Sequence, residues 1–164
     1  TVHKTVSFSP AIMAACRFFL LLVAASTGLT GVSGLALWSA VVLAAYVVGL
    51  SYIARHESTH ATLRHWPVVF LAAPIVLALL ANGEEYRQRA IVLSLVVGLW
   101  ILRSLRPALW SAQPNYGKTV SALLAGIVLV DCLAVLGGGT AEFTTVFVML
   151  FAAALLFQRY VPAT

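Results

Sequence analysis

The chain alternates between long apolar stretches and short polar breaks, and six such stretches fit into 164 residues. Four of the five breaks contain glycine, proline or asparagine, which interrupt regular structure most strongly. Apolar segments are expected at roughly 11–28, 35–55, 66–82, 90–106, 118–136 and 143–159. A helix that crosses a membrane needs about 20 mainly apolar residues, with a range of about 17–25. The pattern therefore predicts six transmembrane spans.

The segments are expected to be helices rather than strands. Backbone polar groups inside a bilayer must be hydrogen-bonded within the protein, which an α-helix achieves by itself. A membrane barrel would show alternating apolar and polar residues, whereas these segments are continuously apolar. We expect an all-α transmembrane bundle that forms a single domain over residues 1–164.

Composition supports a membrane protein. Hydrophobic residues make up 62% of the chain and charged residues 9%, whereas about a quarter of the residues in a soluble domain are charged. The net charge of +5 is explained by the basic residues at the ends of the spans and gives no reason to expect nucleic acid as a partner. The expected partner is the lipid bilayer.

The basic residues sort to one side of the predicted topology. Six spans place both termini on the same side, and that side carries eight of the ten lysines and arginines: Lys4, Arg17, Arg55, Arg64, Arg103, Arg106, Lys118 and Arg159. The other side carries Arg87 and Arg89, with Glu84 and Glu85 nearby. The positive-inside rule then predicts that both termini are cytoplasmic. The expected location is the bacterial inner (cytoplasmic) membrane.

Two ionisable residues fall inside predicted spans, where a charge is costly. Arg17 lies in the first span and either extends back to the cytoplasmic headgroups or faces a cavity and binds an anionic group. Asp131 lies near the outer end of the fifth span. It is either an interfacial residue or has a polar role within the bundle.

The densest polar cluster is Arg55-His56-Glu57-Ser58-Thr59-His60, at the cytoplasmic end of the second span. Its His56-Glu57-x-x-His60 pattern fits the zinc motif of membrane peptidases, with two histidine ligands and a glutamate base. The predicted topology leaves no cytoplasmic carboxylate or cysteine downstream as a third protein ligand. The missing ligand argues against zinc, and a zinc peptidase is the third of three interpretations.

Five stretches carry a resemblance to a known family: AIMAACRFFLLLVAAST (11–27), AYVVGLSYIARHES (45–58), LRPALWSAQP (105–114), GIVLVDCLAV (126–135) and LLFQRYVPAT (155–164). In this order they resemble the C-terminal half of UbiA-superfamily intramembrane prenyltransferases, and most closely the bacterial EboC-like branch. Met13, Cys16 and Arg17 match the start of that half, and Arg55 and Glu57 match the end of its second helix.

The resemblance implies transfer of a polyprenyl group from its diphosphate to an acceptor, often an aromatic ring. It implies Arg17, Arg55 and Arg64 as contacts of the substrate diphosphate, and Glu57 as a catalytic residue and Mg²⁺ ligand. Mg²⁺ is the cofactor implied, because it suits carboxylates together with substrate phosphates.

The chain departs from the family in its acidic residues. The aspartate-rich motif of the family's N-terminal half is absent, and Glu57 is the one acid near 52–60, where the second motif would fall. We therefore expect a module that is incomplete or inactive alone, with an N-terminal half or another membrane subunit as its partner. The alternative is a non-catalytic integral membrane subunit that packs in a larger complex.

Overall fold

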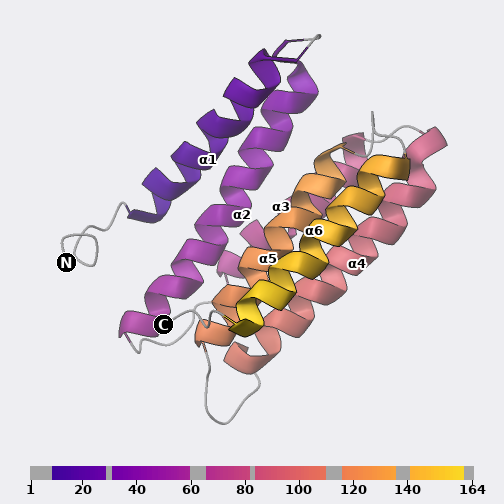
Figure 1. Cartoon of the computed structure of the whole chain (residues 1–164). Coiled ribbons are helices and arrows are strands. Elements are labelled where there is room, and N and C mark those ends of the chain that lie inside the picture. Colours follow the sequence, from indigo (N-terminus) through magenta and orange to yellow (C-terminus); the bar gives the residue numbers. More distant parts are fainter. Residues whose placement is uncertain are drawn as a thin grey trace.

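The computed structural model describes residues 9–28, 31–59, 66–81, 84–109, 116–135 and 141–160. These residues form six α-helices and contain no strand, which confirms the all-α class. The helices, shown in Figure 1, are α1 (Ser9–Ser26), α2 (Gly34–Thr59), α3 (Trp66–Ala81), α4 (Glu84–Leu109), α5 (Tyr116–Val135) and α6 (Ala141–Tyr160).

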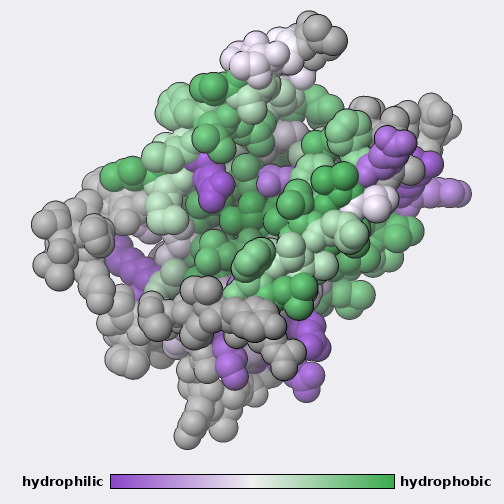
Figure 2. Space-filling view, in the orientation of Figure 1, coloured by the Kyte–Doolittle hydropathy of each residue, from purple (hydrophilic) through white to green (hydrophobic). Residues whose placement is uncertain are grey.

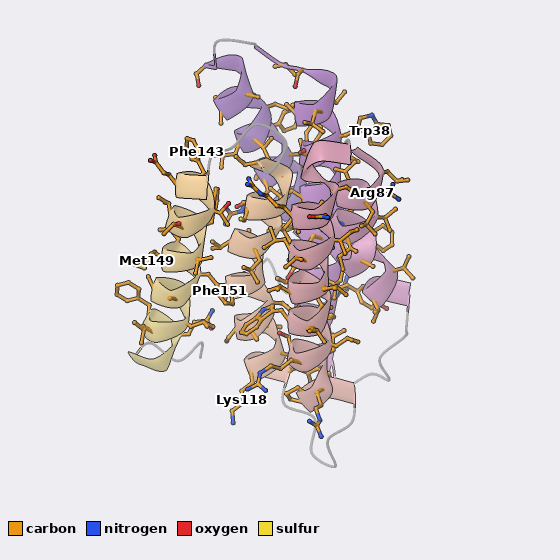
Figure 3. All side chains as sticks on the ribbon, turned by 90° about the vertical axis from the view of Figure 1, so that its right-hand side faces the viewer. Trp38, Arg87, Lys118, Phe143, Met149 and Phe151 are labelled. Carbon is orange, nitrogen blue, oxygen red and sulfur yellow. The ribbon has the colours of Figure 1, made fainter. Side chains whose placement is uncertain are left out.

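Successive helices run in opposite directions (Figure 1). The C-terminal ends of α2, α4 and α6 therefore meet the N-terminal ends of α1, α3 and α5 at the lower end of the bundle in this view. We call this the basic end, because it carries Arg55, Arg103, Arg106 and Lys118. Arg87 and Lys118 lie at opposite ends of the bundle (Figure 3).

Three helices contain stretches that are long and apolar enough to cross a membrane: Gly34–Arg55, Arg87–Ala108 and Tyr116–Val135. The other three contain shorter apolar stretches, Pro10–Ser26, Val68–Leu80 and Glu142–Gln158. Large apolar side chains cover the outside of the bundle, including Leu80, Met149 and Phe157, which are 69–80% exposed. Figure 2 shows the same apolar surface along the middle of one face. The bundle is therefore suited to a membrane, because hydrocarbon imposes no penalty on this exposed surface.

The centre of the bundle is α5, which packs against α2, α3, α4 and α6. The outermost helices are α1, which packs mainly against α2, and α6, which packs mainly against α5. The largest fully buried side chains come from α2, α3, α4 and α5: Tyr46, Ile53, Leu71, Val97, Leu105, Thr119 and Leu123. Among the described residues, neither outer helix contributes a fully buried side chain of this size to the core.

Three side chains fasten α5 to its neighbours. Each comes from a different helix and donates a hydrogen bond to one of three successive main-chain carbonyl oxygens of α5: Gln158 to Ser121 (2.7 Å), Trp100 to Ala122 (2.9 Å) and Tyr46 to Leu123 (2.9 Å). A carbonyl oxygen has two lone pairs, so it can accept such a bond in addition to the helical one. We call this arrangement the α5 clamp. It gives the polar atoms of these side chains the partners that a hydrocarbon environment cannot supply.

The clamp depends on a glycine. A Cβ atom at Gly126 would lie 2.7 Å from the Tyr46 hydroxyl oxygen and 3.1 Å from Cδ1 of Trp100. The missing side chain therefore lets both aromatic residues reach the α5 backbone. The Trp100 ring also packs edge-on against Phe151 of α6, with 4.8 Å between the ring centroids, so it connects α4 to α6 as well as to α5 (Figure 3).

Candidate functional site

The basic end is the first candidate site. Arg55 lies near the C-terminal end of α2, Arg103 and Arg106 near that of α4, and Lys118 in the first turn of α5, and all four side chains are exposed. Arg103 and Arg106 are three residues apart, so their side chains lie on neighbouring positions of one helix face. Guanidinium and ammonium groups are strong hydrogen-bond donors to phosphate oxygens. The basic end is chemically suited to an anion held at the membrane surface.

The predicted residues of the second helix belong to this end. Arg55 lies there, and Glu57 follows two residues later within α2, although its side chain is outside the described part of the structure. The same holds for the side chain of His56. His60 and Arg64 lie outside the described residues altogether. The diphosphate role of Arg64 and the zinc pattern of His56 and His60 therefore stay predictions.

A pocket between α1, α2, α3 and α5 is the second candidate site. Its walls are mainly apolar, with Ser39 and Asp131 as the polar contributors; the lining side chains are Leu21, Leu35, Ser39, Val42, Leu43, Pro74, Leu77, Ala78, Val130, Asp131, Leu133 and Ala134. Its volume is about 30 Å³. On this measure one water molecule needs roughly 10–15 Å³, so the pocket in this conformation has room for about two or three waters.

Arg17 belongs to the pocket region rather than to the basic end. It lies on α1 one turn before the pocket residue Leu21, and its positive charge acts electrostatically on the carboxylate of Asp131. On α2, Arg55 follows the pocket residue Leu43 by twelve residues, which is about 18 Å along a helix. A shared role of Arg17 and Arg55 at one diphosphate stays a prediction.

The proximity of Arg17 and Asp131 could not be predicted from either residue alone. The sequence shows an arginine inside the first apolar segment and an aspartate inside the fifth, and it leaves open whether each faces lipid, water or the bundle. One feature of the sequence could have indicated this proximity, because opposite charges inside two membrane spans tend to pair. Because α1 and α5 are not neighbours in the chain, only the fold shows that the two charges lie near enough to interact electrostatically.

The described residues do not form a Mg²⁺ site. Among them no group of three histidine, cysteine, aspartate or glutamate side chains is placed to hold a metal ion. The described carboxylates, Asp131 and Glu142, lie toward the end of the bundle opposite to the basic end. The role of Glu57 as a Mg²⁺ ligand stays a prediction, because its side chain is outside the described part of the structure.

Comparison of the chain with protein-family models, with curated proteins and with solved structures gives no match.

Proposed function

We propose that the protein is an integral membrane module of the UbiA-like prenyltransferase type, which binds the diphosphate of a polyprenyl substrate at its basic end. In this proposal all six helices span a bacterial inner membrane, and both termini are cytoplasmic. The acceptor is a lipid-soluble molecule, as in the family that the sequence resembles.

Six spans are supported by the alternating directions of the helices and by the apolar side chains on the outer helices. Phe19, Leu20 and Val23 of α1 are 62–64% exposed. The apolar surface of α6 around Met149 is exposed as well. The shortest helix, α3, has 16 residues, which is about 24 Å. It packs against α2, α4 and α5, and a modest mismatch with a hydrocarbon core of about 30 Å is accommodated by local thinning of the bilayer.

The observation that carries the functional proposal is the position of Arg55. It belongs to the segment that resembles the family, and it lies at the same end of the bundle as the exposed Arg103, Arg106 and Lys118. A diphosphate at the membrane surface would meet these donors, while the polyprenyl tail remains among apolar side chains. Electrostatic neutralisation of the departing diphosphate is the contribution that such donors make to prenyl transfer.

The chain does not supply the carboxylates that the family uses. We therefore place the transfer step in an assembly with a second half or another membrane subunit that carries aspartate-rich motifs. In this view the present chain binds the diphosphate and the tail, and the partner completes the catalytic site.

Binding of radiolabelled farnesyl diphosphate to the protein in nanodiscs tests the proposal. A charge-assisted hydrogen bond contributes about 1.5–3 kcal/mol, so Arg55→Gln should weaken binding by roughly 10- to 100-fold. Arg87→Gln is the matched control, because Arg87 is also an exposed arginine and lies at the opposite end. It should leave the affinity unchanged.

Two results would contradict the proposal. Equal losses of affinity in Arg55→Gln and Arg87→Gln would show a general charge effect rather than a site. No saturable binding by the unmodified protein would favour the alternative, a non-catalytic membrane subunit.

A further inference from the structure

The pocket between α1, α2, α3 and α5 lies toward the end of the bundle opposite to the basic end. Asp131 is four residues from the end of α5, Leu77 is four residues from the end of α3, and Ser39 is five residues from the start of α2. These positions lie about 6–8 Å inside the helix ends, whereas Lys118 at the basic end is about 20 Å from Asp131 along α5. A ligand in this pocket is therefore separate from a diphosphate at the basic end.

Two polar side chains supply hydrogen-bonding atoms to this mainly apolar pocket. Asp131 contributes the two oxygens of its carboxyl group, and Ser39, which is buried, contributes a hydroxyl oxygen. Both oxygens of an ionised carboxyl group are acceptors, and a hydroxyl oxygen also accepts hydrogen bonds. The walls therefore offer three acceptor oxygens within one small cavity.

The carboxylate of Asp131 remains available to a ligand. Arg17 acts on it electrostatically, but no direct ion pair joins these two side chains in the described part of the structure. A buried charge is costly unless it is paired and hydrogen-bonded, and ionisable residues inside membrane spans mark ligand or ion sites. A ligand that carries a positive charge and hydrogen-bond donors would offset this cost.

A primary ammonium group fits these acceptors better than a divalent metal ion. It carries one positive charge and three N–H donors, one for each acceptor oxygen of Asp131 and Ser39. By contrast, Ca²⁺ takes about 6–8 oxygen ligands, and Mg²⁺ demands a nearly ideal octahedron. Three oxygens in an apolar pocket meet neither requirement.

The size of the pocket limits what accompanies the ammonium group. A volume of about 30 Å³ has room for about two or three waters, and thus for two or three non-hydrogen atoms. One nitrogen and two methylene carbons fill this space. The carbons would lie against apolar walls that include Leu21, Val42 and Leu43.

We propose that this pocket binds a primary ammonium group on a two-carbon stem. The ammonium group donates hydrogen bonds to Asp131 and Ser39, and the stem packs against the apolar walls. Two kinds of molecule carry this group, namely the headgroup of phosphatidylethanolamine and small free alkylamines. The site does not depend on the proposed diphosphate site or on prenyl transfer.

Binding of ethylammonium to the protein in phosphatidylcholine nanodiscs, with Na⁺ in excess, tests the proposal by saturation-transfer NMR. A ligand of three non-hydrogen atoms is limited to a Kd of roughly 0.5 mM, so we expect saturation in the millimolar range. Tetramethylammonium has the same charge but no N–H donor, and it should not displace ethylammonium. The absence of saturable ethylammonium binding, or equally effective displacement by tetramethylammonium, would overturn the proposal.

Three variants locate the binding site. Asp131→Asn preserves the size of the side chain and removes its charge, so it should raise the Kd at least about tenfold. Ser39→Ala is a smaller change that removes one acceptor, and it should raise the Kd at least about threefold. Glu142→Gln removes a carboxylate outside the pocket and should leave the Kd unchanged. Unchanged binding in both pocket variants would overturn the proposal, as would equal losses in Asp131→Asn and Glu142→Gln, which would indicate a general charge effect.

The lipid composition of the nanodiscs distinguishes the two sources of the ammonium group. If the headgroup of phosphatidylethanolamine occupies the pocket, nanodiscs that contain this lipid should raise the apparent Kd of ethylammonium, because the lipid competes for the pocket. An unchanged Kd, together with binding that still depends on Asp131, would assign the pocket to free alkylamines.

Discussion

Replacement of Gly126 by alanine should weaken the bundle at its centre. The new Cβ atom would lie 2.7 Å from the Tyr46 hydroxyl oxygen, closer than real contacts of this kind. Tyr46 is completely buried and its hydroxyl donates to the Leu123 carbonyl oxygen at 2.9 Å. Its ring therefore cannot move away without disturbing the core. The added Cβ would also lie 3.1 Å from Cδ1 of Trp100, a second tight contact.

The magnitude follows from three contributions. A buried hydroxyl that loses its partner costs about 1–3 kcal/mol, and overpacking a well-filled core costs typically about 1–3 kcal/mol. Alanine has the better helix propensity and returns up to about 1 kcal/mol. The free energy of unfolding of Gly126→Ala should therefore fall by about 1–6 kcal/mol.

Unfolding in mixed micelles with increasing SDS, followed by far-UV circular dichroism, measures this change. Gly98→Ala is the matched control, because a Cβ there would make only an ordinary contact, 3.5 Å from Cδ1 of Ile75. It should be neutral or stabilising. In the double variant Tyr46→Phe with Gly126→Ala, the hydroxyl that clashes is gone, so the loss should be smaller than the sum of the single losses. Equal stability of Gly126→Ala and Gly98→Ala would refute the role assigned to the clamp.

Two further predictions concern polar and apolar burial. The Ser94 hydroxyl is buried without a hydrogen-bond partner among the described residues, so Ser94→Ala should be neutral or stabilise the protein by up to about 2 kcal/mol. By contrast, Ser104→Ala removes a 2.7 Å hydrogen bond to the Trp100 carbonyl oxygen, so this variant should not be more stable than the unmodified protein. Leu71 is fully buried and Leu80 is 80% exposed, so Leu71→Ala should lower the free energy of unfolding by about 2–5 kcal/mol and Leu80→Ala by much less. The same SDS titration measures all four, and stabilisation by Ser104→Ala or equal losses for both leucine variants would contradict this description of the core.

The number and order of the helices could be predicted from the sequence because each apolar segment is bounded by residues that interrupt helices. The boundaries were less accurate where charged residues continue a helix. The fourth segment was expected at roughly 90–106, but α4 extends from Glu84 to Leu109. Glu84, Arg87 and Arg89 lie on its N-terminal extension, and arginine and glutamate are good helix formers. A pattern based on apolarity alone stops too early at such residues.

The contacts that organise the bundle were not predictable in the same way. Tyr46 and Leu123 are 77 residues apart, and a tyrosine in an apolar segment does not indicate which carbonyl oxygen it will reach. Gly126 lies within the fifth apolar segment like any other small residue, and its role becomes evident only from the side chains that meet there.

The most direct test of the account is the side of the membrane that each helix end faces. Single cysteines at Thr27, Arg55, Gln88, Lys118 and Phe143 can be labelled with an impermeant maleimide in intact spheroplasts and in inside-out vesicles, in a background without the native cysteines. Six spans with cytoplasmic termini predict labelling of positions 27, 88 and 143 from outside and of positions 55 and 118 from the cytoplasmic side. If only the three long apolar stretches of α2, α4 and α5 crossed the membrane, position 27 would still be labelled from outside and position 55 from the cytoplasmic side. Positions 88 and 143 would then be cytoplasmic, and position 118 would be external. That pattern would contradict the six-span arrangement and the proposed cytoplasmic position of the basic end.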